Sequence, residues 1–437
     1  ILFDRDRNVW IGSYFGGIDY LLSDYEQFQV FEPGDDPASL KARVPRDIIE
    51  PEPGIFWIAT EDGGINIYDR KASRFTVFNG IPGMGNNIHA LYYDRNTGEI
   101  WIGTRFEGLY RYNIHTHRHV HYLHARGLDT EGVFYFAQQK SGRMWIATMQ
   151  GLRYYDPASD LFRTVGNSKL DKQFIYTLHI DNDDNLWVGT INSGIFHINH
   201  ANQKVTGISK ESGKGLLENY IISLFRDSRG TLWIGTNNSG LQYLNTKTGI
   251  IQSLDDEKFR KATICSIEED NSGALWISTS QGLFRYDPAT HAVNRFTAQS
   301  NGLPSNQFNY ASSMKTADGT MLFGTINGLI AFRPQNVKVN NGPFYVHLRQ
   351  YDDVERIVLS HDQASHFVLD YGVIMPSNSS TIRYQVWLEG IDKRMKRNES
   401  KDLKEDPSAP HQRIAWLQPM VRSLDSALRA ALRMTWG

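Results

Sequence analysis

Five histidines gather within ten residues, in the run HTHRHVHYLH (115–124). They are His115, His117, His119, His121 and His124. Alternate residues of a strand point to the same face, and imidazoles at that spacing could bind zinc. The run nevertheless occupies the outermost strand of its unit in the repeat described below, where side chains face solvent. We therefore expect an exposed polar strand here and no metal site.

The run DNDDN (181–185) places carboxylates at alternating positions, like the start of a calcium-binding loop. Such a loop needs glycine at its sixth position and glutamate at its twelfth, where this chain has Leu186 and Asn192. The run also falls where other units have a hairpin turn, so we expect a solvated turn. The chain contains no Gly-x-Ser-x-Gly, His-Glu-x-x-His or Gly-x-x-x-x-Gly-Lys-Ser/Thr motif. No catalytic residue, metal or cofactor is predicted.

The elements that must position any site are short strands repeated along the chain. The stretch TLWIGTNNSGLQYL (231–244) indicates two strands around a turn, and it recurs in seven other places, for example as NLWVGTINSGIFHI (185–198). Its anchors are Trp10, Trp57, Trp101, Trp145, Trp187, Trp233 and Trp276, with Leu322 in the eighth place. Successive anchors are 42–47 residues apart. A period of that length built from strands is typical of β-propeller blades.

Each unit has the pattern of a four-stranded blade. Glycine three residues before most anchors, such as Gly230, allows the positive φ of a tight turn. A small residue two places after the anchor, such as Gly235, indicates a neighbouring sheet too close for a side chain. A fourth strand such as RFTVF (74–78) completes the unit. The pattern predicts an all-β propeller whose tryptophans pack between blades.

The two ends of the repeat bear on the number of blades. The last unit stops after its third strand, near Phe332, whereas QFQVF (27–31) is a fourth strand without a unit. If these two strands pair, the ring has seven blades; if QFQVF completes its own unit, it has eight. We favour seven, with the propeller over residues 23–340. Residues 1–22 are then the end of a preceding propeller or an extra blade.

Composition and charge argue against several classes of protein. The 437 residues include 46 Lys plus Arg and 48 Asp plus Glu, so no basic surface for nucleic acid is implied. No run approaches 18 apolar residues, and no transmembrane helix is expected. The single cysteine, Cys265, is expected in the first strand of a blade and cannot form an internal disulfide. A start within a strand, without Met or a signal-peptide pattern, suggests an excerpt of a longer protein.

A binding site is predicted where the loops after the second strands and before the first strands meet around the axis. Amides beside aromatic rings suit a sugar, whose hydroxyls need directional partners while its C–H face stacks on rings. The predicted ligand-binding residues are Arg105, Glu107, Gln150, Asn192, Asn238, Gln281, Tyr135, Asn306 and Tyr310. The same loops carry Asn87, His89, Phe134, Phe174, Asn219, Tyr220, Asn237, Gln307 and Asn327. Polar loops are often simply solvated, and that alternative stays open.

The repeated pattern D-x-x-G-x-L-W-I-G-T-x-x-x-G-L-x-x-Y resembles the two-component regulator propeller repeat. MLFGTINGLIAFRPQNV (321–337) is similar to that family's closing blade motif. FVLDYGVIMPSNSSTIRYQVWLEGIDKRM (367–395) is similar to the first half of the small β-sandwich, named for its tyrosines, that follows such propellers. The resemblance implies a partial sandwich over residues 341–396. Residues 397–437 lack the family's Leu-x-Pro-Gly-x-Tyr strand and predict instead an atypical tail with a short Ala/Leu/Arg helix, as a truncated or frame-shifted end would.

The resemblance also implies a function. In this family the repeats build the periplasmic sensor region of hybrid two-component systems in polysaccharide-degrading bacteria. It implies an oligosaccharide ligand, a homodimer in the full receptor, and membrane and histidine kinase segments elsewhere in the protein, with no enzymatic activity in these residues. Two alternatives stay open. One is a lyase-type enzyme, for which His89 beside Arg105 and Glu107 is the only indication, and the other is a scaffold that binds another protein.

Overall fold

The computed structural model divides the chain into two compact units. One is Asp24–Lys338, and the other combines Ile1–Ser23 with Val339–Gly437. The structure describes residues 1–3, 7–14, 17–21, 27–167, 169–245, 248–254, 256, 258–338, 346–348, 369–373, 383–386, 396–399 and 412–414.

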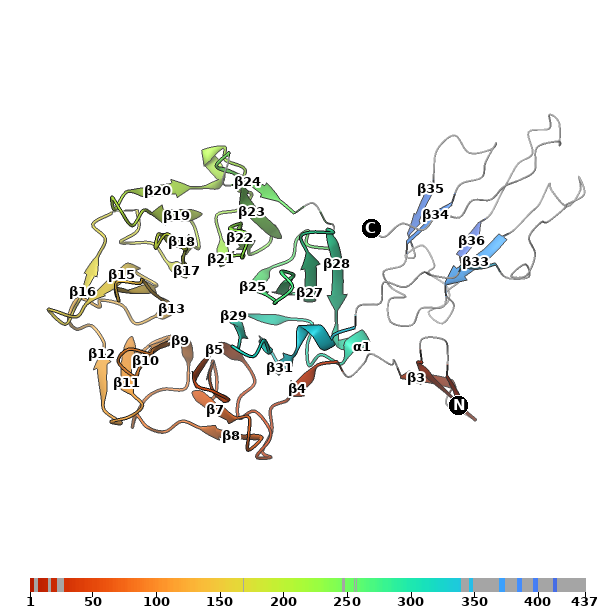
Figure 1. Ribbon diagram of the computed structural model, residues 1–437, viewed down its shortest axis with the longest axis horizontal. Coiled ribbons are helices and arrows are strands. Elements are labelled where there is room, and N and C mark those ends of the chain that lie inside the picture. Colours follow the sequence, from red (N-terminus) through yellow and green to blue (C-terminus); the bar gives the residue numbers. More distant parts are fainter. Residues whose placement is uncertain are drawn as a thin grey trace, which may run out of the picture. The chain divides into compact units, whose positions relative to one another are not determined.

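Seven four-stranded antiparallel sheets form a ring in the described part of Asp24–Lys338, with first strands inside and fourth strands at the rim (Figure 1). The first strands are β5 (Pro45–Glu52), β9 (Ile88–Asp94), β13 (Val133–Gln138), β17 (Ile175–Ile180), β21 (Ile221–Arg226), β25 (Ile264–Glu269) and β29 (Phe308–Lys315). The second strands are β6 (Ile55–Thr60), β10 (Glu99–Thr104), β14 (Met144–Thr148), β18 (Leu186–Thr190), β22 (Leu232–Thr236), β26 (Leu275–Thr279) and β30 (Met321–Thr325). The prediction of an all-β propeller is confirmed.

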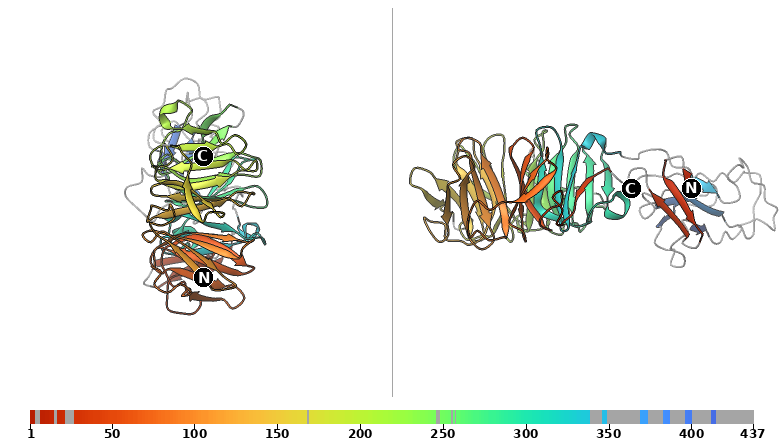
Figure 2. Two further views of the ribbon diagram at one scale, coloured as in Figure 1. Left: turned by 90° about the vertical axis from the view of Figure 1, so that its left-hand side faces the viewer. Right: turned by 90° about the horizontal axis from the view of Figure 1, so that it is seen from below.

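The outer half of each sheet follows the same order. The third strands are β7 (Ile65–Asp69), β11 (Leu109–Asn113), β15 (Gly151–Asp156), β19 (Ile195–Ile198), β23 (Leu241–Asn245), β27 (Gly282–Asp287) and β31 (Gly328–Phe332). The fourth strands are β8 (Arg74–Val77), β12 (His119–Tyr122), β16 (Leu161–Thr164), β20 (Val205–Ile208), β24 (Ile250–Ser253), β28 (Ala292–Phe296) and β4 (Gln29–Phe31). Three single turns of helix, η1 (Lys210–Ser212), α1 (Ala298–Asn301) and η2 (Pro334–Asn336), lie in the connections. Seen from its edge, the ring is a disc, and the strands run across its thickness (Figure 2).

Strand β4 closes the ring from the other end of the chain. Its residues 29–31 pair antiparallel with residues 329–331 of β31. Phe28, just before β4, packs edge-on against Phe332 with ring centroids 5.0 Å apart. The first strands β29 and β5 are also in contact, so the last sheet adjoins the first. The predicted pairing of QFQVF with the third strand of the last unit is confirmed.

The anchor residues pack between neighbouring sheets, as predicted. Trp233 is 4% exposed and shares a buried cluster with Ile264 and Leu275 of the next sheet. Five anchors of the ring are buried in this way: Trp57, Trp101, Trp145, Trp233 and Trp276. Leu322 at the eighth position is also buried, against the sheet that begins with β5.

Two anchors depart from that prediction. Trp187 is only half-buried, and His197 covers it with ring centroids 4.3 Å apart. Trp10 is half-buried in the other compact unit, in a three-stranded sheet that lacks a fourth strand. A tryptophan becomes inaccessible only where both its own sheet and a neighbour cover it, and neither residue has that full cover.

The aspartate of the repeat has a structural role that the sequence did not reveal. Asp227 accepts the indole N–H of Trp233 at 3.0 Å and the backbone N–H of Thr231 at 2.8 Å. Asp181 likewise accepts the indole N–H of Trp187 at 3.1 Å. It also accepts the backbone N–H groups of residues 183 and 185. The run DNDDN is therefore a turn, as predicted, but it is only partly solvated, because Asp181 and Asp184 are each 7% exposed.

Both glycine expectations are confirmed in the same unit. Gly230 has φ of 87°, which its turn requires. A Cβ atom on Gly235 would lie 2.8 Å from Ile264 Cγ2 of the next sheet and 2.1 Å from Ser223 Oγ. The small residue after the anchor therefore sets how closely two sheets approach.

The second unit contains three small sheets among its described residues. β1 (Leu2–Phe3), β2 (Val9–Ser13) and β3 (Gly17–Leu21) form one of them. β32 (Val346–Leu348), β33 (Leu369–Val373) and β36 (Gln412–Ile414) form the second, and β34 (Arg383–Val386) and β35 (Lys396–Glu399) the third. Strand β36 lies in the predicted atypical tail and was not expected; the predicted Ala/Leu/Arg helix lies outside the described residues. No helix in the described part of the chain is long and apolar enough to cross a membrane.

Candidate functional site

An irregularity near the start of each first strand makes its second residue leave the regular pairing. In β9, β13, β17, β21 and β25 the register slips around the second residue, and β5 and β29 have a longer irregularity there. A bulge leaves a residue unpaired and re-aims its side chain. These residues are Arg46, His89, Phe134, Tyr176, Ile222, Cys265 and Asn309. All seven are 0–7% exposed. We call them the axial ring.

Contacts across the axis show that the axial ring converges. The guanidinium of Arg46 donates to Tyr176 Oη and to Asn309 Oδ1, each at 3.3 Å. It also lies 3.0 Å from His89 Nδ1 and 3.4 Å from the carboxylate of Glu61. Arg46 lies in β5, and these partners come from β9, β17, β29 and the loop after β6, which can meet only at the centre. Arg46 Nε is buried without a hydrogen-bond partner among the described residues.

Burial and the neighbouring guanidiniums keep His89 neutral. Its pKa is lowered to about 2, first by burial and then by the positive charges of Arg46 and Arg105. The neutral ring accepts the Arg46 N–H at Nδ1. A histidine held in this way is a weak base near neutral pH.

Aromatic side chains cover the axial ring on the side of the predicted site. Phe134, Phe174, Tyr176, Tyr220 and Tyr310 form the axial aromatic cluster. Tyr176 is its hub, with ring centroids 5.9 Å from Phe134, 6.1 Å from Tyr220 and 5.9 Å from Tyr310. Phe174, Tyr220 and Tyr310 keep part of their surface exposed. The cluster therefore offers aromatic faces to anything that approaches the axis from this side.

Two of the nine predicted site residues join this cluster. The guanidinium carbon of Arg105 lies 5.2 Å from the centre of the Phe134 ring. Tyr310 lies beneath Arg46, whose guanidinium carbon is 5.7 Å from its ring centre. Both side chains are half-buried, so each has one surface in the protein and one toward solvent.

The other seven predicted residues are not members of this cluster. Glu107 accepts the Gly85 N–H at 2.9 Å and the Tyr110 hydroxyl at 3.1 Å, so it braces the loop before β9. Asn306 accepts the Ala298 N–H at 2.7 Å and holds α1 in the same manner. Gln150, Asn192 and Asn238 are exposed on the loops after second strands, and Gln281 is half-buried there. Tyr135 lies deeper, one residue beyond the axial ring.

Sequence reasoning missed Arg46, Tyr176 and Asn309. Each is the second residue of a first strand, a position that alternation assigns to the space between two sheets. The bulge turns it to the axis instead. An alignment of the units could have found these residues. At that position it shows residues as different as Arg46, Phe134 and Cys265. Residues that pack between sheets, such as the anchor tryptophans, are of one type in most units, so this variety indicates a different environment.

Two carboxyls lie deeper in the ring. Burial raises the pKa of Asp47 to about 7, against hydrogen bonds from the backbone N–H groups of Leu91 and Ile48. Burial also raises the pKa of Glu268 to about 7, and this carboxyl accepts one hydrogen bond, from Ser313 Oγ at 2.9 Å. Both negative charges act on Tyr135, whose pKa is raised mainly by burial.

Replacing Glu268 with glutamine should remove part of the pH dependence of stability. The pKa of this carboxyl is about 7 in the folded protein and about 4.3 in the unfolded chain. Because the folded state holds the proton more tightly, the free energy of unfolding falls as pH rises between those two values. We expect the melting temperature of the wild type, relative to Glu268→Gln, to fall between pH 4 and pH 7 and to level off above pH 8. Thermal melts over pH 4–8.5 measure this difference. Parallel profiles for the two proteins would contradict the assignment, and Glu32→Gln, at an exposed position, serves as the control.

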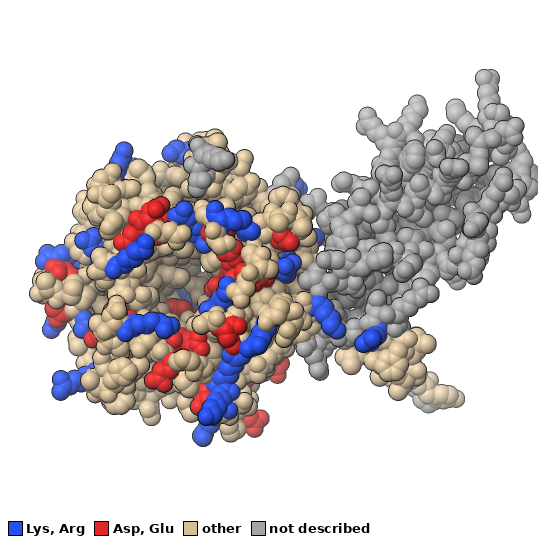
Figure 3. Space-filling model, viewed as in Figure 1, with Lys and Arg blue, Asp and Glu red and all other residues tan. Residues whose placement is uncertain are grey.

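The described residues show no group of three or more His, Cys, Asp and Glu side chains arranged to hold a metal. In the histidine run, His121 stacks on Tyr110 with ring centroids 4.0 Å apart, and His117 Nδ1 lies 2.8 Å from the Tyr112 hydroxyl. The five histidines are exposed, as predicted for an outermost strand. Figure 3 shows one face of the ring, with charged side chains of both signs around a central hollow. The arrangement offers rings, amides and charges for binding.

Comparison with known families supports the resemblance noted in the repeats. The model of the two-component regulator propeller matches residues 82–106, 169–192 and 215–238. The chain carries two-component regulator propeller repeats. Each match covers the first two strands of a sheet and so includes the axial-ring residue His89, Tyr176 or Ile222.

Two solved structures share the fold, and one longer protein is similar in sequence. An extracellular domain assigned to a hybrid two-component system of B. thetaiotaomicron superimposes with a TM-score of 0.73 and 22% identity, over 94% of this chain and 56% of that one. Histidine kinase P4 of Formosa agariphila is 26% identical over 349 residues, which are 75% of this chain and 25% of that protein. The chain thus spans a quarter of the curated relative and somewhat more than half of the solved domain. A virginiamycin B lyase of Staphylococcus aureus has a TM-score of 0.54 and 13% identity, over 70% of this chain and 98% of that one.

Proposed function

We propose that this chain is the extracytoplasmic, periplasmic sensor region of a transmembrane hybrid two-component regulator. The propeller repeats and the likeness to extracellular domains assigned to such systems support this function. Ligand binding here would be relayed through segments outside these residues to a histidine kinase, in a receptor that works as a homodimer. Similarity to a histidine kinase over a quarter of that protein's length fits a chain that supplies one part of such a receptor.

We further propose that the ligand is an oligosaccharide bound at the axial face. The observation that carries this is the axial aromatic cluster, whose partly exposed rings lie beside Arg105 and the amide-rich loops that bear Asn192 and Asn238. Rings stack on the C–H faces of sugars, and amides and guanidiniums bond their hydroxyls. The contributing side chains come from separate sheets. A ligand that joins them would favour one arrangement of the sheets over another, which is all that sensing requires.

A lyase remains the second candidate, because a propeller lyase shares the fold. His89 is the histidine on the axis, and its buried, neutral state beside Arg46 argues against a role as general base. Incubation with a panel of oligosaccharides tests both functions at once. Binding alone should raise the melting temperature and leave every oligosaccharide intact. Cleaved products would instead support the lyase.

Alanine at Arg105 or Asn238 should abolish the response of the full receptor to its inducing glycan. Arg105 contacts the axial aromatic cluster, and Asn238 is exposed on the loop after β22. Neither side chain belongs to the core, so the melting temperature should change little. A transcriptional reporter in cells that express the full receptor measures the response. Arg74→Ala, at an exposed rim position in β8, should respond as the wild type does. Normal responses from both axial variants would place the ligand elsewhere, in another segment of the receptor or at a dimer contact.

A further inference from the structure

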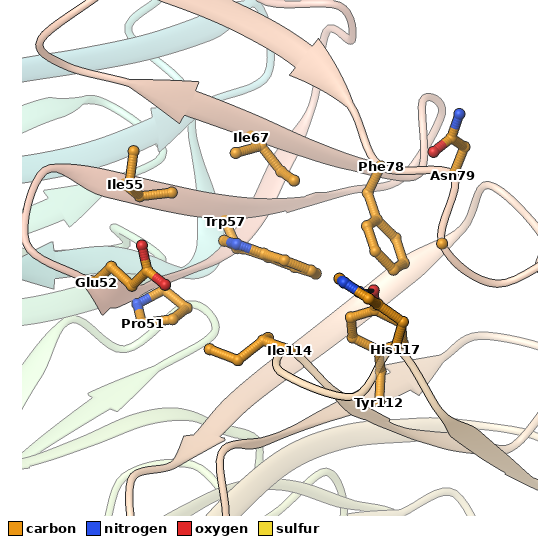
Figure 4. Close-up of a pocket in the computed structure, with 11 residues that line it drawn as sticks. Pro51, Glu52, Ile55, Trp57, Ile67, Phe78, Asn79, Tyr112, Ile114 and His117 are labelled. Carbon is orange, nitrogen blue, oxygen red and sulfur yellow. Dashed lines mark hydrogen bonds between the residues drawn. The ribbon is translucent and has the colours of Figure 1, made fainter.

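A cavity of about 480 Å³ opens between the first two sheets of the ring, away from the axial face. Pro51 and Glu52, at the last residues of β5, line one end of it, whereas the axial loops precede the first strands. Figure 4 shows Trp57 between Glu52 on one side and Phe78 and Tyr112 on the other. We call this cavity the Trp57 pocket. Its volume is in the range of small-molecule sites.

One residue beside the pocket is shorter than its equivalents in the other sheets, and Trp57 keeps 7% of its surface exposed there. In each sheet the residue directly across from the anchor, on the third strand, lies on the same face and can cover it. That residue is Arg111 for Trp101, Tyr154 for Trp145, His197 for Trp187, Tyr243 for Trp233, Arg285 for Trp276 and Ile67 for Trp57. The first sheet alone among these has an aliphatic residue there. Ile67 lines the pocket and leaves part of the space open.

The next sheet shows what the missing group does. The guanidinium carbon of Arg111 lies 5.2 Å from the centre of the Trp101 ring. The same guanidinium forms an ion pair with Glu99 at 3.2 Å. The cation is stabilised both by the cation–π interaction with the indole and by the charge-assisted hydrogen bond to the carboxylate. Trp101 and Glu99 are thus an internal receptor for an arginine side chain.

The Trp57 pocket also has an indole and a carboxylate but no cation, and its carboxylate comes from the end of β5, because Ile55 occupies the position of Glu99. Trp57 supplies the indole, and Glu52 supplies an exposed carboxylate that forms none of the ion pairs found among the described residues. Ile55 and Phe78 are half-buried and add apolar wall for an aliphatic stem. We propose that the Trp57 pocket binds an alkylguanidinium group supplied from outside the chain, with its stem against Ile55 and its cation between Trp57 and Glu52.

Butylguanidinium and its neutral isostere butylurea test this proposal. Each probe is titrated against the chain in a calorimeter or by ligand-observed NMR. Butylguanidinium should bind in the millimolar range, and butylurea at least about fivefold more weakly. The difference is modest because cation–π and charge-assisted contacts contribute little at an open site. Glu52→Gln should reduce the binding of butylguanidinium by about the same factor. Glu32→Gln, an exposed glutamate outside the pocket, should not change it. Equal binding of the two probes, or full binding by Glu52→Gln, would overturn the proposal.

A second variant fills the pocket from within. Ile67→Arg places an arginine opposite Trp57, in the register that Arg111 has opposite Trp101. This variant should lose measurable butylguanidinium binding while melting at or above the temperature of the wild type. Retained binding would show that the probe sits elsewhere. An acetylated Gly-Arg-Gly amide distinguishes the sources of the group: tighter binding than butylguanidinium points to a protein side chain, and no binding to a small molecule. This site is separate from the axial face, so its outcome is independent of the glycan proposal.

Discussion

Replacing Trp233 with alanine should lower the free energy of unfolding by about 3–5 kcal/mol. The indole is 4% exposed and fills the space between its own sheet and the next, where it lies in one cluster with Ile264 and Leu275. Its Nε1 donates to Asp227, which also holds the preceding turn. The substitution therefore creates a cavity and leaves one acceptor of that turn without its indole partner.

Urea denaturation of the wild type and the variant measures this loss. Trp187→Ala is the matched control, because Trp187 occupies the same position of its unit but is half-buried. It has the same bond from its indole to an aspartate, Asp181. The control should lose clearly less stability, since less apolar surface returns to water. Equal losses at both positions would mean that the turn, and not the packing between sheets, determines the cost.

The fold could be predicted because its determinants are periodic. An anchor tryptophan, a turn glycine and a small residue recur with a regular spacing, and each has one physical reason that applies in every sheet. Gly235 illustrates this, because the close approach inferred from one small residue is found in the structure, where a Cβ atom would lie 2.8 Å from Ile264 Cγ2. The unpaired strand at residues 27–31 could be matched to its partner for the same reason.

The candidate site was only partly predictable, because it depends on departures from the period. A bulge turns Arg46 and Tyr176 toward the axis, against the alternation that a strand pattern implies. Glu107 has the residue type expected of a binding loop, yet its carboxylate is occupied by Gly85 and Tyr110. The Trp57 pocket is lined by Ile67, and the difference between Ile67 and its equivalents in the other sheets appears only when cross-strand pairs are compared.

Deleting residues 1–31 should destabilise the ring by more than any single substitution described above. Strand β4 supplies the fourth strand of the last sheet, and Phe31 is 6% exposed in the cluster that contains Leu329. Its removal exposes the edge of β31 and the apolar surface that Phe28 and Phe31 cover. The loss of two buried phenylalanines alone costs roughly 5 kcal/mol or more. We expect a melting temperature lower by at least about 10 °C, with aggregation through the open edge.

The control for this deletion is the removal of residues 1–23, which lie outside the compact unit and should leave the melting temperature of the ring unchanged. A peptide of residues 25–33 added to the protein without residues 1–31 should restore much of the lost stability, because an extended peptide can pair with an exposed sheet edge. Val30→Pro in that peptide should weaken the rescue, since proline removes an N–H that a paired strand can donate. If the longer deletion melts like the shorter one, closure by β4 is not what holds the ring together, and the contact between β29 and β5 is sufficient.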